Sequence, residues 1–228
     1  MKLVTYAAAI AAVAAAGSAA AGTVYDNGPK NGTVDAWKIG VDSFSDDFQI
    51  ANTFTAGTNN FATGMTFESW EAGSANAVTS VDWAIYNGNP FSGGTQLYNG
   101  VASVSSTWDG FAGGVFTGSG FSLYSNTISF GGTFNVSSNC GGVCWIVLSH
   151  ATDQLGDLVY WDENNGPSTA WSNFVGDMHG FDIPGTTASE TFSILGSVPE
   201  PASWALMLSG FAGLGAVLRS RRKAPVPT

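Results

Sequence analysis

The sequence predicts an all-β fold: an antiparallel β-sandwich, jelly-roll-like, flanked by an N-terminal signal helix and a C-terminal transmembrane helix. Three observations favour it. Only 11% of the residues are charged, against about 25% in average soluble domains. Glycine contributes 30 of the 228 residues, and together with Ser, Thr and Asn it is typical of short strands joined by tight turns. Short apolar runs recur between these turn clusters, which argues against helical bundles and coiled coils.

Ten apolar or alternating runs are the expected strands of a domain over residues 23–195. They are Ala36–Ile39, Phe48–Phe54, Phe61–Trp70, Ser80–Tyr86, Thr95–Val104, Val115–Leu123, Thr127–Val136, Val143–His150, Gly156–Trp161 and Glu190–Leu195. Val81, Trp83 and Ile85 fall on one face of their strand. Cys144, Ile146 and Leu148 share a face of another strand in the same way. No helical period of useful length appears between residues 23 and 198.

The first 22 residues have the composition of a secretory signal peptide. Met1-Lys2 starts a short basic region, and an Ala-rich apolar run extends to Ala16. The small residues that follow, Ser18-Ala19-Ala20 among them, fit the A-x-A pattern of signal peptidase sites. An N-terminal anchor helix is the alternative, and the apolar run is short for one. We therefore expect export and removal of residues 1–22.

A second apolar segment lies near the C-terminus, after a linker over residues 196–201 that contains Pro199-Glu200-Pro201. Residues 202–218 carry no charge, and as a helix they would extend about 25 Å, the lower limit for crossing a bilayer. Trp204 occupies an interfacial position, and a basic cluster follows that would stay cytoplasmic: Arg219, Arg221, Arg222 and Lys223. Residues 202–223 are thus predicted to be a transmembrane helix with a basic tail.

The order of these parts resembles the PEP-CTERM sorting signal of Gram-negative bacteria: Pro199-Glu200-Pro201, then Trp204 in a short apolar helix with Gly210-Phe211, then the arginine cluster. The resemblance implies attachment to the inner membrane, processing there by an exosortase-type membrane transpeptidase, and delivery to the cell surface or extracellular matrix. It also implies association with exopolysaccharide. An ordinary C-terminal anchor is the alternative.

Two further blocks, residues 25–29 and residues 160–168, resemble segments of many exported PEP-CTERM proteins of unassigned function. This resemblance implies a β-rich fold and an exported location. It implies no particular chemistry.

The folded region is strongly acidic. The whole chain has a formal net charge of −10 and a pI of about 4.2. Between Thr23 and Val198 there are 16 acidic residues and only two basic ones, Lys30 and Lys38, which leaves a net charge of −14. Such a field repels polyanions, so we expect no nucleic-acid partner. Solubility of a secreted protein and binding of divalent cations are the two interpretations of this charge.

Cys140 and Cys144 are the only cysteines, separated by Gly141, Gly142 and Val143. In an exported protein such a close pair is expected to form a disulfide, because the two glycines allow the backbone to turn back. Free thiols and a metal-binding pair are the alternatives, and a metal would need two further ligands.

Signals of catalysis are weak. The sequence contains no G-x-S-x-G elbow, no P-loop and no G-x-G-x-x-G that opens a helix. The two histidines, His150 and His179, are interpreted as ordinary polar residues. Asp162 and Glu163 are the candidate carboxylates for glycoside hydrolysis, but adjacent residues of a strand point to opposite faces. We therefore expect no enzymatic activity, with a glycan-active hydrolase as the alternative.

The segment Trp-Asp-Glu-Asn-Asn-Gly at residues 161–166 is the most suggestive constellation for ligand binding. Flat aromatic rings stack on sugars and planar polar side chains bond to hydroxyls, so the candidate glycan-binding residues are Trp161, Asp162, Asn164 and Trp171. The oxygens of Asp162, Glu163 and Asn164 also suit Ca²⁺, although their spacing is not that of an EF-hand. The competing interpretation is a polar hairpin turn flanked by core tryptophans.

Taken together, the sequence predicts an exported cell-surface or matrix protein that is sorted by its C-terminal signal and associated with exopolysaccharide. A calcium-assisted, lectin-like glycan-binding module is the first alternative. A secreted hydrolase is the second.

Overall fold

The computed structural model describes residues 22–30, 36–40, 48–57, 60–71, 77–111, 121–173, 185–187, 189–197, 209–211 and 213. The chain divides into two compact units, Ala21–Ser197 and a second unit formed by Met1–Ala20 with Val198–Thr228. In the second unit Ser209–Phe211 and Gly213 are helical, and the rest of the predicted signal peptide and C-terminal helix lies outside the described residues. None of the helices within the described ranges combines the length and the apolar character needed to cross a membrane.

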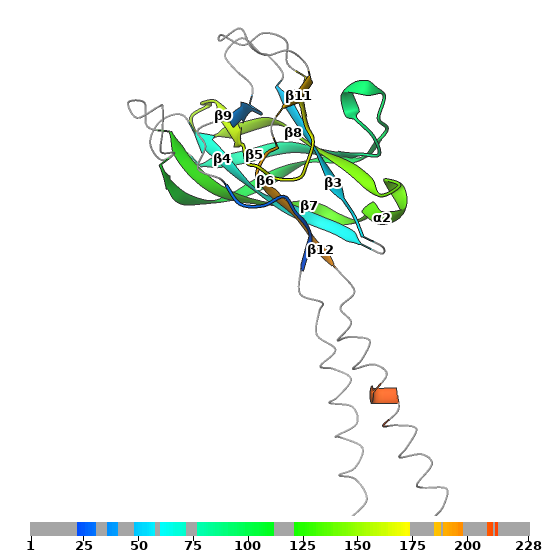
Figure 1. Cartoon of the computed structure of the whole chain (residues 1–228). Coiled ribbons are helices and arrows are strands. Elements are labelled where there is room, and N and C mark those ends of the chain that lie inside the picture. Colours follow the sequence, from blue (N-terminus) through cyan, green and yellow to red (C-terminus); the bar gives the residue numbers. More distant parts are fainter. Residues whose placement is uncertain are drawn as a thin grey trace, which may run out of the picture. The chain divides into compact units, whose positions relative to one another are not determined.

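The described strands all belong to the first unit (Figure 1). They are β1 (Gly22–Asp26), β2 (Ala36–Lys38), β3 (Gln49–Thr55), β4 (Phe61–Glu71), β5 (Val78–Tyr86), β6 (Gln96–Phe111), β7 (Ser122–Asn135), β8 (Val143–Asp153), β9 (Val159–Asp162), β10 (Ala170–Ser172), β11 (Gly185–Thr187) and β12 (Phe192–Ser197). Two short helical segments accompany them: η1 (Pro90–Ser92) between β5 and β6, and α2 (Val136–Asn139) between β7 and β8.

The strands form one antiparallel sheet in the order β1-β12-β4-β7-β6-β5-β8-β3-β10-β11, and β9 joins β4 and β2 beside this path. Strand β6 connects two parts of the sheet, because its residues 96–103 pair with β5 and its residues 104–111 pair with β7. We call β5, β8, β3, β10 and β11 the β5 half, and β7, β4, β12, β1, β9 and β2 the β7 half. The sheet curls so that both halves contribute to one core.

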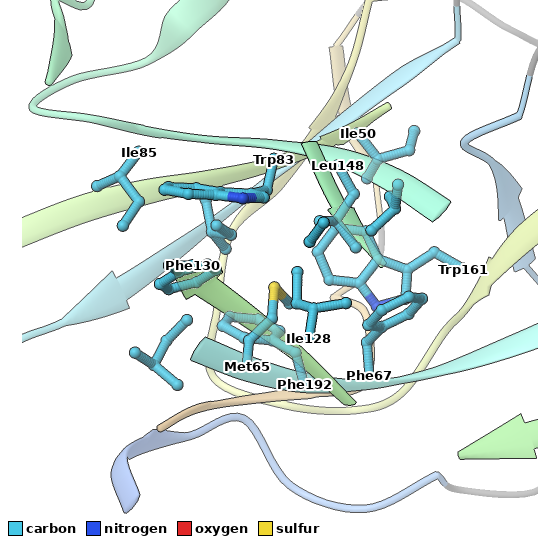
Figure 2. Close-up of a cluster of buried hydrophobic side chains, with 14 of the residues drawn as sticks. Ile50, Met65, Phe67, Trp83, Ile85, Ile128, Phe130, Leu148, Trp161 and Phe192 are labelled. Atoms are coloured by element: carbon cyan, nitrogen blue, oxygen red, sulfur yellow. The ribbon is translucent and has the colours of Figure 1, made fainter. Parts of the chain in front are cut away.

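The hydrophobic core lies between the two halves (Figure 2). Its labelled side chains come from both: Ile50, Trp83, Ile85 and Leu148 from the β5 half, and Met65, Phe67, Ile128, Phe130, Trp161 and Phe192 from the β7 half. The rings of Trp83 and Phe130 meet across the core with their centroids 4.2 Å apart. The predicted alternation is confirmed, since Val81, Trp83 and Ile85 are all buried, and so are Cys144 and Ile146.

Most of the predicted strands are present, and two are much longer than predicted. β6 has 16 residues and β7 has 14, because exposed Ser, Thr and Asn residues continue their ladders beyond the apolar runs. The predicted strand Val115–Leu123 falls largely on residues 112–120, outside the described ranges, and strand is assigned only from Ser122. The short strands β1, β10 and β11 were not predicted. The antiparallel all-β class is confirmed.

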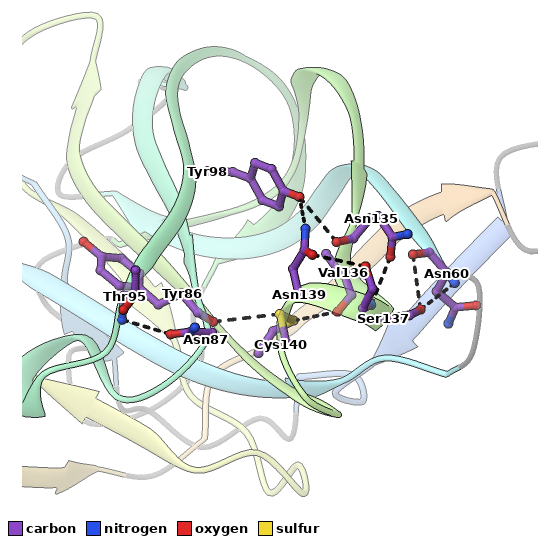
Figure 3. The surroundings of a disulfide bond; sticks show 12 residues. Asn60, Tyr86, Asn87, Thr95, Tyr98, Asn135, Val136, Ser137, Asn139 and Cys140 are labelled. Atoms are coloured by element: carbon purple, nitrogen blue, oxygen red, sulfur yellow. Dashed lines mark hydrogen bonds between the residues drawn. A yellow bond between two sulfur atoms is a disulfide. The ribbon is translucent and has the colours of Figure 1, made fainter.

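The cysteine pair closes the turn after α2 (Figure 3). Cys140 and Cys144 form a disulfide with their Cα atoms 5.0 Å apart, as their spacing predicts. Gly141 and Gly142 have φ angles of 63° and 106°, values that favour glycine and allow the tight return. The side chain of Asn135 caps α2 by accepting a hydrogen bond from the Ser138 amide at 3.1 Å. The disulfide therefore fixes the short connection from β7 to β8.

Candidate functional site

Two turns with the same Asn-Gly-Pro sequence pack against each other. Asn27-Gly28-Pro29 follows β1, and Asn165-Gly166-Pro167 follows β9. Gly28 has a φ of 89°, which an L side chain rarely adopts. Gly166 lies so close to the other turn that a Cβ added there would overlap the carbonyl oxygen of Asn27. Residues 25–29 and residues 160–168 are therefore one structural unit, in which the two turns pack closely against each other.

Asn27 is the centre of a hydrogen-bond network and is completely buried. Its Nδ2, which carries two hydrogens, lies within hydrogen-bond distance of three acceptors: Ser189 Oγ at 2.6 Å, Ser168 Oγ at 3.0 Å and the carbonyl oxygen of Glu190 at 2.5 Å. Its Oδ1 accepts from the Tyr25 hydroxyl at 2.9 Å and from the Ser168 amide at 3.0 Å. One amide side chain therefore holds together β1, the 160–168 block and the segment that leads into β12.

Asn164, a predicted glycan-binding residue, completes this network from the other turn and is 3% exposed. Its Nδ2 donates to the carbonyl oxygens of Asn27 and Gly28 at 2.9 and 3.0 Å. Its Oδ1 accepts from Ser189 Oγ at 2.7 Å and from the Gly166 amide at 2.9 Å. An amide side chain offers two donors and one two-fold acceptor, so Asn164 has no capacity left for a ligand in this structure.

An open cleft of about 390 Å³ lies where the two turns meet, lined by residues 26–30 and 164–167. A second groove of about 250 Å³ shares Asp26, Gly28 and Pro29 and is otherwise lined from β4, β12 and the residue before it. Lys30, at the rim of the cleft, forms an ion pair with Asp109 of β6. The cleft is open and more of its lining is apolar than polar, and the amides of Asn27 and Asn164 that reach it are bonded within the protein. It can hold water or hydroxyl groups, and it offers no aromatic wall to a sugar.

Asp162 lies at the end of β9 and is 3% exposed. Its Oδ1 accepts from Trp70 Nε1 at 2.6 Å, and its Oδ2 accepts from Thr191 Oγ1 at 2.7 Å. Burial raises the pKa of Asp162 from 3.8 to about 6, and the two hydrogen bonds only partly oppose this shift. Because the protonated form is favoured in the folded protein, the stabilisation from Asp162 is full below pH 3.8 and is lost as the pH rises through about 6.

Trp161 is a core residue. Its indole is 0% exposed and packs edge-on against Phe67 and Phe192, with ring centroids 6.3 and 5.8 Å away. Its Nε1 donates to the carbonyl oxygen of Thr191 at 2.9 Å. No face of the ring is left for a sugar, so the prediction that Trp161, Asp162, Asn164 and Trp171 share one exposed glycan surface does not fit this arrangement. The competing interpretation, a polar turn flanked by a core tryptophan, describes residues 161–166 better.

The oxygens predicted to bind calcium accept hydrogen bonds from the protein. This holds for both carboxylate oxygens of Asp162 and for the Asn164 amide oxygen, and Glu163 Oε1 accepts from Trp37 Nε1. Across the described residues, no three His, Cys, Asp or Glu side chains gather where they could hold a metal ion. The groups that surround these three residues are hydrogen-bond donors from tryptophan, threonine, serine and the backbone. Such donors stabilise an oxygen atom that accepts hydrogen bonds, whereas a cation needs further oxygen ligands around it.

Two of the remaining predicted residues lie elsewhere. Trp171 sits in β10, pairs with Ala51 of β3 and is partly exposed. His150 lies in β8 with its Nδ1 3.1 Å from Asp82 Oδ2, on a residue with a φ of 47° where β8 bulges against β5. His179 lies outside the described residues. Neither Trp171 nor His150 contacts the turns around Asn27 in the described network.

Glu71 is a functional candidate that the sequence analysis did not single out. It ends β4, is 0% exposed, and its Oε1 accepts from Ser69 Oγ at 2.8 Å. Within the described part of the chain, nothing bonds to its Oε2. Burial raises the pKa of Glu71 from 4.5 to about 9, and the carboxylates of Asp153 and Asp157 add to this shift. The sequence shows Glu71 only as an acidic residue directly after the predicted strand Phe61–Trp70. Because the end of a strand is normally exposed, this position does not predict a buried carboxyl group.

Among known protein families, one matches the C-terminal segment of the chain. Residues 197–223 match the family model described as the PEP-CTERM protein-sorting motif. The chain carries a PEP-CTERM motif. No curated protein and no solved structure matches the chain. The PEP-CTERM motif marks an exported protein that carries a membrane-anchored sorting signal until an exosortase processes it.

The predicted sorting residues all fall inside the matched range. They are Pro199, Glu200, Pro201, Trp204, Arg219, Arg221 and Arg222. Their positions lie outside the described residues. The match begins at the last residue of β12, so the PEP-CTERM motif follows the sheet without an intervening domain.

Proposed function

We propose that this chain is delivered to the cell surface or extracellular matrix, where its β-domain takes a structural or binding role in the exopolysaccharide layer. The observation that supports the proposal is the PEP-CTERM motif at residues 197–223. An acidic domain that contains a disulfide suits an oxidising location outside the cytoplasm. We describe the delivered domain as a jelly-roll-like sandwich, because the two halves of its sheet face each other across one core.

The proposed role is not enzymatic. Asp162 and Glu163, the carboxylates that the sequence offers for hydrolysis, are both at most 8% exposed. Each accepts a hydrogen bond from a tryptophan indole, Trp70 for Asp162 and Trp37 for Glu163. A general acid must reach the atom that it protonates, and these two groups reach structural partners instead. Turnover of a polysaccharide that is lost in Glu163→Gln would contradict this part of the proposal.

The sorting step is tested on the chain expressed in a host with a functional exosortase. Mass spectrometry of the surface-exposed protein gives its mature C-terminus, and fractionation gives its location. We expect a C-terminus near Pro199-Glu200-Pro201 and loss of surface delivery when these three residues are replaced by alanine. The matched control replaces Pro225 and Pro227, which lie beyond the matched range. An intact Arg219–Lys223 tail on the surface-exposed protein would defeat the proposal.

A further inference from the structure

The outer face of the β5 half carries three partly exposed aromatic side chains. In β5 and β8 the inward residues are Trp83, Ile85 and Ile146, which are buried in the core. Strand neighbours alternate between faces, so Tyr86 and Trp145 point outward. Both are partly exposed, and they lie directly opposite each other in the β5–β8 ladder.

Trp171 lies on the same face two strands away from Trp145. It pairs with Ala51, which pairs with Val147, two residues along β8 from Trp145. Strand and residue spacings place the Cα atoms of Trp145 and Trp171 about 12 Å apart. The residues between them, Ala51 and Val147, are short and buried. The two tryptophans are therefore spaced at an interval that several sugar rings in a chain could span.

The indole N–H groups of these two tryptophans differ in their bonding from those of Trp37, Trp70 and Trp161. Trp37, Trp70 and Trp161 each donate to a protein acceptor. Within the described part of the chain, no acceptor bonds to Nε1 of Trp145 or Trp171. A tryptophan with a partly exposed ring and an unused N–H can stack on a ligand and donate to it at the same time.

Polar groups on the same face are uncharged or paired. The hydroxyl of Tyr86 donates to Gln96 Oε1 at 2.8 Å, which fixes the ring and leaves the Gln96 amide N–H groups for other partners. The carboxylate described next to these aromatics is that of Asp82, whose Oδ2 lies 3.1 Å from Nδ1 of His150. The folded region as a whole carries a net charge of −14. A polyanion is thus repelled at long range and meets no lysine or arginine among the residues described on this face, whereas a neutral polymer meets no electrostatic penalty.

We propose that Tyr86, Trp145 and Trp171 form the surface through which this protein binds an uncharged polysaccharide. The rings stack on successive sugar faces, and the two indole N–H groups and the Gln96 amide donate to sugar hydroxyls. The inference rests on the proposed function, because it names the site and the charge class of the exopolysaccharide that the domain contacts. It replaces the buried Trp161, Asp162 and Asn164 with residues that the fold leaves accessible, and it needs no calcium.

The test uses the full chain in mild detergent, in native gels cast with neutral polysaccharides (dextran, galactomannan, hydroxyethylcellulose) or with the polyanion alginate. Co-sedimentation with the host's own exopolysaccharide runs in parallel, with calcium and with EDTA. We expect retardation by at least one neutral polymer and not by alginate, equal in both buffers. Trp145→Ala and Trp171→Ala should each weaken the apparent affinity at least about tenfold. Trp108→Ala is the matched control, since Trp108 is 56% exposed and pairs with Tyr124 in the β7 half.

The outcomes separate this inference from the proposed function. Host exopolysaccharide that binds all variants equally would overturn the aromatic surface and leave the proposed association intact. An unaltered protein that binds no exopolysaccharide would overturn both, while C-terminal processing still reports on sorting. Retardation by alginate alone would overturn the neutral ligand class. If an alanine variant loses its fold, Trp145→Phe and Trp171→Phe keep a ring and remove the N–H, and each should still bind the neutral polymer more weakly than the unaltered protein does.

Discussion

Replacing Asn27 by alanine is the most informative perturbation of the fold, because so many partners depend on one buried side chain. The change removes the hydrogen bonds that Asn27 makes with the Ser168 amide at 3.0 Å and with the Glu190 carbonyl oxygen at 2.5 Å. Removing one partner of a hydrogen bond in a protein interior costs about 1–3 kcal/mol, so removing two costs about 4 kcal/mol. Folded domains are stable by only about 5–15 kcal/mol. For a domain of this size the loss corresponds to a fall in Tm of about 8–16 °C.

Differential scanning calorimetry of the unaltered chain and of Asn27→Ala gives this difference directly. Asn165→Ala is the matched control, since Asn165 is the same residue type in the facing turn and is exposed. Its Tm should change by no more than about 2 °C, as for most surface substitutions. A fall in Tm for Asn27→Ala as small as that of the control would refute the reasoning, since it would mean that water replaces the lost bonds.

Three further predictions concern stability. The free energy of unfolding should fall as the pH rises from 4.5 to about 9, because the raised pKa of Glu71 favours its protonated form in the folded state. Glu71→Gln should make the free energy of unfolding depend less on pH and should raise Tm at pH 8. Urea titrations across this pH range measure the dependence, and the same dependence in Glu71→Gln would contradict the prediction. Gly166→Ala should lower the free energy of unfolding by about 1–3 kcal/mol or more, because the added Cβ overlaps the carbonyl oxygen of Asn27. An unchanged midpoint of urea unfolding would show that the two turns can move apart to make room for the methyl group. Serine at both Cys140 and Cys144 should cost roughly 2 kcal/mol in the loop-entropy model; reduction of the unaltered protein should give the same loss, and a discrepancy between the two would point to strain from the substitutions.

The strands that were predicted well from the sequence are those in which apolar residues alternate with polar ones. Val81, Trp83 and Ile85 identify β5 and its buried face because only one register hides all three. The far end of β6 has no such pattern, since Ser103, Ser105 and Thr107 are exposed and read as a loop when taken alone. Their neighbours in β5 and β7 make them strand. That is a non-local reason, which composition cannot supply.

The candidate site was harder to predict because the residue types of a sugar site and of a buried polar junction are the same. Trp161, Asp162 and Asn164 have the chemistry of a lectin loop. In the fold their polar atoms form hydrogen bonds within the protein instead, with Thr191, with Trp70 and with the turn at Asn27. Which tryptophan is exposed depends on strand parity and pairing partners, and these become known only with the register. The sorting motif needed no fold, since it is read as a linear segment.

The position of β12 in the sheet has a mechanical consequence. β12 lies between β1 and β4, with its ladders running along both sides, and the PEP-CTERM motif begins at its last residue. Any tension that reaches the domain through a C-terminal attachment therefore enters the sheet at the end of β12. Tension that runs along this strand loads both ladders in shear, so their hydrogen bonds resist together instead of opening one after another. The strand that leads into the C-terminal segment is thus hydrogen-bonded to a neighbouring strand on each side.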